Sequence, residues 1–352
     1  MKKRLDWLDA GKGLGMLLVM MGHADIPEYL KTYIYTFHMP LFFFLSGYLF
    51  KIEKYPNLKV FLIKRTKSLV LPYLCFSLVA YLWFLVVYYY GKVDYHDNLF
   101  TPLIGTFIDI RKSNWTVHSG ALWFVACLFC TELFFYLISK IGRTNKKISF
   151  LLILLSVIGC IYNKMGGQPL PWSIDVAMIS VGFYGIGYFY KEYREKLERF
   201  INFKTFIFFL LVNTAAGYFN YVLTGDRVDF YNSSLGNILL FYMAAFSGIG
   251  AFMIGIKRIK RSQALQYIGK NSIIYLALHQ KIIFFLISIV MQKYVLDNLD
   301  LVDIPVIKGL LYTFTAAFVL MPAVYIINHY LPFMLGKIGR EKGSVKSSMK
   351  TQ

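Results

Sequence analysis

The sequence predicts an all-α polytopic membrane protein with about ten transmembrane helices and both termini in the cytosol. Of its 352 residues, 57% are hydrophobic and 16% are charged, whereas about 25% of the residues of a soluble domain are charged. The apolar residues form ten blocks, most of them near the roughly 20 residues that a helix needs to cross a bilayer. These properties exclude a soluble enzyme, a disordered chain and a disulfide scaffold. The blocks cover residues 13–22, 32–50, 69–90, 120–139, 148–162, 172–190, 205–223, 235–256, 271–291 and 305–327.

The distribution of Lys and Arg predicts the orientation of the helices. Basic residues cluster in alternate gaps between the blocks, and such clusters remain on the cytosolic side of a membrane. The net charge of +19 is divided among separate loops, so we expect no nucleic-acid partner, which would need one contiguous basic surface. We expect a single transmembrane domain over residues 1–331 and a basic, disordered cytosolic tail over residues 332–352.

The first block and its polar flank carry three ionisable side chains on one helical face. Lys12 and His23 are 11 residues apart, which places them on the same face and separates them by roughly 16 Å along the axis. Asp9 precedes Lys12 by three residues and can pair with it. Glycines within residues 11–15 allow another helix to approach closely. A purely structural interpretation would make Lys12 an interfacial anchor and His23 a helix-end cap.

Later blocks contain further ionisable residues, which are costly in hydrocarbon and are therefore functional candidates. His38 stands two residues before Pro40, and proline frees a backbone carbonyl that a neighbouring polar group must satisfy. Three histidines in separate blocks suit proton handling, because imidazole titrates near neutrality. Together they favour an active site or a proton-coupled pathway. The candidates in the later blocks are His38, Glu132, Asp175, His279 and Lys281.

Several short motifs resemble those of the acyltransferase family 3 membrane proteins, and especially the fucose 4-O-acetylase-like branch. The motifs occur in the family's order and extend from residue 5 to residue 279, and the ten-helix plan also agrees. They are LDWLDAGKG at 5–13, GH at 22–23, FHMPLFFFLSGYL at 37–49, KR at 64–65, LVLPY at 69–73, LWF at 122–124 and IGKNSIIYLALH at 268–279.

The resemblance implies transfer of an acetyl group from acetyl-CoA, as co-substrate, to a sugar hydroxyl of a cell-surface polysaccharide or lipid-linked glycan. It also implies a multi-pass protein of the bacterial inner membrane, in contact with membrane lipid. The wider family commonly has an arginine eleven positions before the first-helix histidine, where this chain has Lys12. Lysine keeps the charge and loses the bidentate geometry. Lys64, Arg65 and Lys67 stand at the family's cytosolic arginine pair and are our candidates for recognising the CoA phosphates.

The chemistry of acyl transfer suggests roles for the candidates. A sugar hydroxyl needs a base to accept its proton as it attacks the thioester, and we assign that role to His23, with Lys12 and Asp9 beside it. Candidates to hold the His23 ring are Asp175, Glu132 and His38, and candidates to stabilise the oxyanion are Ser46, Asn271 and Lys12. Trp123 and His279 complete the expected substrate-binding set.

Two other functions are compatible with the same residues. A transporter or flippase for a glycan or lipid-linked sugar would use the histidines as a proton relay, although we find no internal repeat of the kind that transporters contain. A non-catalytic membrane partner that organises polysaccharide synthesis would consume no thioester. No metal is expected, because the histidines lie on separate helices without ligand spacing.

Overall fold

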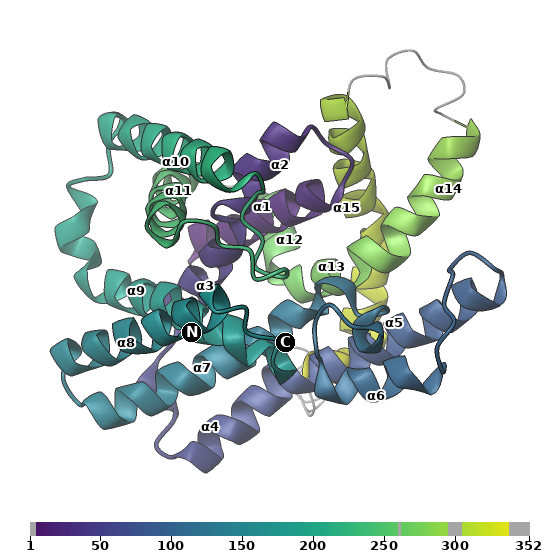
Figure 1. Ribbon diagram of the computed structural model, residues 1–352, viewed down its shortest axis with the longest axis horizontal. Coiled ribbons are helices and arrows are strands. Elements are labelled where there is room, and N and C mark those ends of the chain that lie inside the picture. Colours follow the sequence, from purple (N-terminus) through teal and green to yellow (C-terminus); the bar gives the residue numbers. More distant parts are fainter. Residues whose placement is uncertain (1–4, 260–261, 295–304, 338–352) are drawn as a thin grey trace, which may run out of the picture.

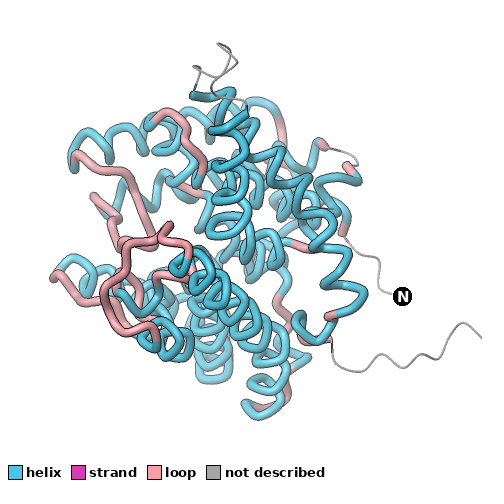
Figure 2. The backbone as a smooth tube through the Cα atoms, turned by 90° about the vertical axis from the view of Figure 1, so that its right-hand side faces the viewer, coloured by secondary structure: helices cyan, strands magenta, loops and turns pink. Residues whose placement is uncertain are grey.

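A computed structural model describes residues 5–259, 262–294 and 305–337, and the elements in these ranges are helices (Figure 1). The only β-type pairing among them is an isolated antiparallel bridge between Asp229 and Ser234. The prediction of an all-helical protein is therefore confirmed for the described residues. Figure 2 shows the same bundle from the side, with loops joining the helix ends.

Seven of the described helices are long and apolar enough to cross a membrane. They support a multi-pass membrane protein, and the count of ten and the cytosolic placement of the termini stay predictions. The seven spans are Leu58–Tyr89, Gly120–Gly142, Asn145–Lys164, Phe203–Thr224, Ile238–Arg258, Ser272–Val290 and Pro305–Tyr330.

The helices of the three remaining apolar blocks are not among these seven spans, each for an identifiable reason: low hydropathy or charge in the first and sixth blocks, and a break in the second block. Helix α1 (Asp6–His23) begins with charged residues in its first two turns. The second block is broken between α2 (Glu28–Tyr35) and α3 (His38–Leu49). Helix α9 (Ile174–Glu198) is rich in glycine and tyrosine and ends in a charged segment. In Figure 1, α10 and α11 flank α1 on one side and α14 and α15 on the other.

Five of the other helices begin at a residue whose side chain caps them. Side-chain oxygens of five residues accept a hydrogen bond from the first turn of the helix that follows, an arrangement that satisfies otherwise unpaired amides. These caps are Asn57, Thr144, Asn202, Asn237 and Ser262. The other helices are α4 (Leu58–Arg65), α5 (Leu71–Tyr89), α6 (Phe100–Ile108), α7 (Trp123–Gly142), α8 (Asn145–Lys164), α10 (Phe203–Thr224), α11 (Ile238–Arg258), α12 (Gln263–Lys270), α13 (Ser272–Leu278), α14 (Phe284–Tyr294) and α15 (Pro305–Tyr330).

π-helical turns interrupt two of the seven spans. Thr66–Val70 joins α4 to α5, and His279–Ile283 joins α13 to α14. A π turn inserts one residue into the helix and changes which side chains face a neighbour. The second turn matters for the site, because it contains one of the three histidines.

Reciprocal pairs of glycines bring two pairs of helices into backbone contact. A Cβ atom at Gly13 of α1 would lie 1.9 Å from a carbonyl oxygen of α12, and one at Gly269 of α12 would lie 1.8 Å from a carbonyl oxygen of α1. Gly47 of α3 and Gly187 of α9 face each other in the same way, at 1.9 and 2.0 Å. Gly11, in contrast, meets side chains at 3.7 Å. The close approach predicted for the first helix is thus made by Gly13 rather than by Gly11.

The predicted disordered tail begins with an ordered segment. Pro332–Leu335 forms a 3-10 helix that packs against α5, with Met334 buried. Gly336 follows at φ +67° and lies against the carbonyl of Lys67. The remainder of the predicted tail, and the basic cluster at residues 2–4, lie outside the described residues.

Candidate active site

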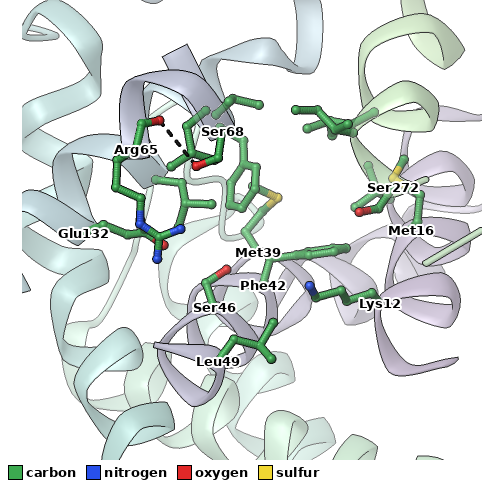
Figure 3. Close-up of a pocket in the computed structure, with 17 residues that line it drawn as sticks. Lys12, Met16, Met39, Phe42, Ser46, Leu49, Arg65, Ser68, Glu132 and Ser272 are labelled. Atoms are coloured by element: carbon green, nitrogen blue, oxygen red, sulfur yellow. Dashed lines mark hydrogen bonds and ion pairs between the residues drawn. The ribbon is translucent and has the colours of Figure 1, made fainter. Parts of the chain in front are cut away.

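Two cavities lie along α1, one beside each end of the predicted functional face. The inner cavity, beside the N-terminal half of α1, has a volume of about 310 Å³ and includes Lys12, Ser46, Arg65 and Glu132 in its lining (Figure 3). The outer cavity, beside the C-terminal end of α1, has a volume of about 380 Å³ and contains His23. The separation of Lys12 and His23 along the helix thus places them in different cavities.

A buried ion pair occupies one wall of the inner cavity. The Arg65 Nε lies 2.6 Å from Glu132 Oε2, and the Tyr184 hydroxyl donates to Glu132 Oε1 at 3.3 Å. The Arg65 guanidinium also lies 5.2 Å from the centre of the Tyr55 ring, a cation–π distance. Figure 3 shows Lys12 projecting into the cavity from the side opposite this pair. The Arg65–Glu132 pair and the Lys12 ammonium thus lie on opposite sides of the cavity.

The outer cavity gathers the three histidines predicted from separate helices. His23 and His38 line it, and the ring of His279 lies 5.3 Å from the ring of His23, centre to centre. His38 Nδ1 is 2.8 Å from the Ile34 carbonyl oxygen, and His279 Nδ1 is 2.9 Å from that of Tyr275. A carbonyl only accepts hydrogen bonds, so both rings carry hydrogen on Nδ1, and the neutral form of each ring keeps a lone pair on Nε2.

Gln280 also contacts His23, and no pattern in the sequence singles it out. Its side-chain Nε2 lies 3.3 Å from His23 Nδ1. The π turn that begins at His279 places these two consecutive residues beside the end of α1. Periodicity of an ordinary helix does not predict this arrangement, because consecutive residues of an α-helix point about 100° apart.

The two carboxylates considered as partners for His23 are engaged elsewhere, which corrects that part of the prediction. Glu132 pairs with Arg65 in the inner cavity. Asp175 forms an ion pair with Arg111, a fully buried side chain from the loop after α6. Both carboxylates were selected because a charge is costly inside a membrane, and both are compensated by an arginine instead of a histidine.

The buried ion pair of Asp175 organises the loops that surround the outer cavity. Arg111 donates to the Phe230 carbonyl at 3.0 Å and to the Ser233 hydroxyl at 3.1 Å. Lys112, which lines the outer cavity, donates to the Asn232 carbonyl. Desolvation lowers the pKa of the Lys112 ammonium, and the neighbouring Arg111 guanidinium lowers it further. Asp175 therefore acts on the cavity through the loops and does not line it.

Three apolar side chains line both cavities. Val19 of α1, Met39 of α3 and Leu276 of α13 contribute to the inner and to the outer lining. They lie between the level of Lys12 and that of His23 on α1. We call these three residues the apolar neck. Trp123 lines the outer side only, and Ser46 lines the inner side only.

The remaining predicted residues lie away from the cavity linings. Lys64 and Lys67 are exposed on α4 and the following π turn, where Lys64 donates to the Lys54 carbonyl. Asn271 stands between α12 and α13 and accepts a hydrogen bond from Asn328 at 2.8 Å. Asp9 is buried on α1 where α12 crosses it.

The fold and the cavities define a multi-pass integral membrane protein that encloses a polar site among its helices. Comparison with known families identifies its lineage. The acyltransferase domain model of acyltransferase family 3 matches residues 5–329, and the chain belongs to this family. Neither the curated proteins nor the solved structures give a significant match. The fucose 4-O-acetylase-like branch stays a prediction.

Proposed function

We propose that this membrane acyltransferase transfers an acetyl group from acetyl-CoA to a sugar hydroxyl of a cell-surface polysaccharide or lipid-linked glycan in the bacterial inner membrane. One observation carries the proposal: histidines from three segments converge on a cavity that meets a second, lysine-bearing cavity at the apolar neck. Two substrates can then approach each other within the bundle without sharing one chamber.

The inner cavity receives the acyl donor. Its volume of about 310 Å³ suits the pantetheine arm and acetyl group, while the nucleotide of CoA stays outside it. Exposed Lys64 and Lys67 on the adjoining segment provide cations for the nucleotide's phosphates. Lys12 and Ser46 provide a positive charge and a hydroxyl beside the pantetheine arm as the acyl group extends towards the apolar neck.

The outer cavity receives the acceptor, with His23 as the general base. The Gln280 amide can rotate to present its oxygen to His23 Nδ1, which then carries hydrogen and leaves Nε2 basic. Nε2 takes the hydroxyl proton as the sugar oxygen bonds to the acyl carbon. The carbon–sulfur bond breaks, and the CoA thiolate recovers that proton from His23 and leaves as free CoA.

The experiment that tests this function is acetyl-CoA turnover by the full chain in nanodiscs. Free CoA is measured with and without a lipid-linked glycan extract, and the acceptor is analysed by mass spectrometry for an added acetyl group. Acceptor-dependent CoA release and acetylation are the expected results. A folded protein that neither binds acetyl-CoA nor releases CoA would contradict the proposal and support a glycan transporter instead.

The apolar neck is expected to limit the length of the acyl group. Replacing Met39 with Ala removes most of a side chain that lines both cavities, so a longer chain can pass. We expect Met39→Ala to raise kcat/KM for butyryl-CoA relative to acetyl-CoA by about tenfold, the size of effect that one or two methylenes have in an apolar pocket. The measurement is the ratio of the two initial rates at subsaturating donor.

The matched control for this prediction is Met253→Ala. Met253 is a buried methionine of α11, and it lies outside both cavity linings. The control removes the same volume from the bundle and should leave the donor ratio unchanged. If the ratio of kcat/KM for butyryl-CoA to that for acetyl-CoA were also unchanged in Met39→Ala, the apolar neck would not select the length of the acyl chain.

A further inference from the structure

A third cavity adjoins the outer one and lies between two membrane-spanning helices. It has a volume of about 470 Å³ and runs between α5 and the segment formed by the second π turn and α14. Gln280 and Lys281 line both this groove and the outer cavity. The groove therefore borders the chamber that contains His23. We call it the lateral groove.

The walls of the lateral groove are aromatic and are held together by a specific hydrogen bond. Trp83 of α5 donates from its indole nitrogen to the Lys281 carbonyl at 2.9 Å. The π turn makes that carbonyl available, because the regular helical pairing is interrupted there. The Trp83 ring also lies edge-on against Phe285, with centres 5.9 Å apart. Phe84 completes the apolar wall.

The charge in the lateral groove is positive. Of the described residues that line it, Lys92 and Lys281 are cationic and none carries a carboxylate. Lys281 belongs to a membrane span and is exposed on the bundle, and its ammonium has no hydrogen bond or ion pair within the ranges that the structure describes. An intramembrane lysine without a protein partner is costly unless it meets an anion or water. An anionic ligand with an apolar tail would satisfy both the lysines and the aromatic wall.

We propose that the lateral groove binds the acceptor substrate as a lipid phosphate that carries a saccharide. The hydrocarbon chain lies along Trp83, Phe84 and Phe285, the phosphate lies at Lys281, and the saccharide extends past Gln280 into the outer cavity. This inference rests on the proposed acyltransferase function and narrows its acceptor to the lipid-linked class. It gives Lys281 a positioning role that is separate from acid–base chemistry.

The proposal is tested first by binding, without any acyl donor. The full chain in detergent is titrated with a fluorescent short-chain polyprenyl phosphate, and unlabelled competitors are then added. We expect polyprenyl phosphate to compete at least about tenfold better than polyprenol, phosphatidylglycerol or inorganic phosphate, as one lost charged contact costs that much. If phosphatidylglycerol competed as well as polyprenyl phosphate, the groove would be a general phospholipid site. If inorganic phosphate competed as well, it would be a site for soluble anions. If polyprenol competed as well, the phosphate would not be recognised. Each of these results overturns the proposal.

Three variants locate the binding determinants. Lys281→Gln should weaken binding of the labelled phosphate about tenfold and leave polyprenol binding unchanged, whereas Trp83→Ala should weaken both. Lys164→Gln is the matched control, because Lys164 is an exposed lysine at the end of α8, outside the groove. Lys281→Gln removes a charge from a membrane span and should not impair folding. Unchanged phosphate binding in Lys281→Gln would refute the assignment.

Kinetics then separate this proposal from the proposed function. In Lys281→Gln the KM for a lipid-phosphate-linked acceptor should rise about tenfold, with little change in the KM for acetyl-CoA. Groove binding without any acetyl transfer would refute the acyltransferase function and leave the lipid site standing. Acetyl transfer without groove binding would refute only the lipid site.

Discussion

The His23→Ala variant should fold normally and lose acyl transfer by about 10²–10⁴-fold, the usual contribution of a general base. The loss follows from the position of His23, which lines the outer cavity and contacts Gln280 through Nδ1. Without the imidazole, the sugar hydroxyl must attack the thioester while it keeps its proton. The measurement is the initial rate of acceptor-dependent CoA release, together with the mass of the acylated product.

The control for this prediction is His329→Ala, which replaces an exposed histidine near the end of α15. It changes the same residue type outside the two cavities and should leave the rate unchanged. Thermal unfolding of both variants should match that of the unsubstituted chain. Full activity in His23→Ala would instead make His38 or His279 the base, since each keeps a lone pair on Nε2 beside the same cavity.

The second large effect is expected on stability, at the crossing of α3 and α9. In Gly47→Ala the added Cβ would lie 1.9 Å from the carbonyl oxygen of Tyr184, so the two backbones must separate. We expect a destabilisation of about 3 kcal/mol, at the upper end of the range for overpacked sites. The measurement is the thermal unfolding midpoint in detergent, and a fall of several degrees is expected.

Gly255→Ala provides the comparison, because its Cβ would meet only a side chain, at 3.7 Å. Alanine favours a helix by up to about 1 kcal/mol over glycine, so this control should be neutral or stabilising. If the unfolding midpoint of Gly47→Ala equalled that of Gly255→Ala, α3 and α9 could separate without cost. The glycine pair would then not determine how these two helices pack. A shift of α9 would also move Tyr184, which hydrogen-bonds Glu132 in the inner cavity.

The sequence was sufficient to predict helices and to single out the three histidines as functional candidates. Apolar blocks long enough for membrane spans indicate helices directly, since a bilayer leaves few other ways to satisfy the backbone. His23, His38 and His279 stand out because ionisable groups are rare in such blocks, and the structure brings them together around the outer cavity. Their roles in catalysis stay predictions.

The sequence could not predict the partners of these groups. Gln280 contacts His23 because a π turn changes the direction of side chains after Leu278, and that turn has no periodic signal. Arg111 reaches Asp175 from a loop that lies 64 residues earlier in the chain. Hydropathy identifies which charges need compensation, whereas the choice of partner depends on how loops fold back over the bundle.

The apolar neck also helps the membrane to remain an electrical barrier. A bundle with polar cavities approached from opposite sides would conduct protons or ions if water filled it continuously. Val19, Met39 and Leu276 line both cavities, and an apolar junction of this kind excludes water and blocks conduction. The same three side chains that an acyl group must pass would therefore preserve the membrane potential between turnovers.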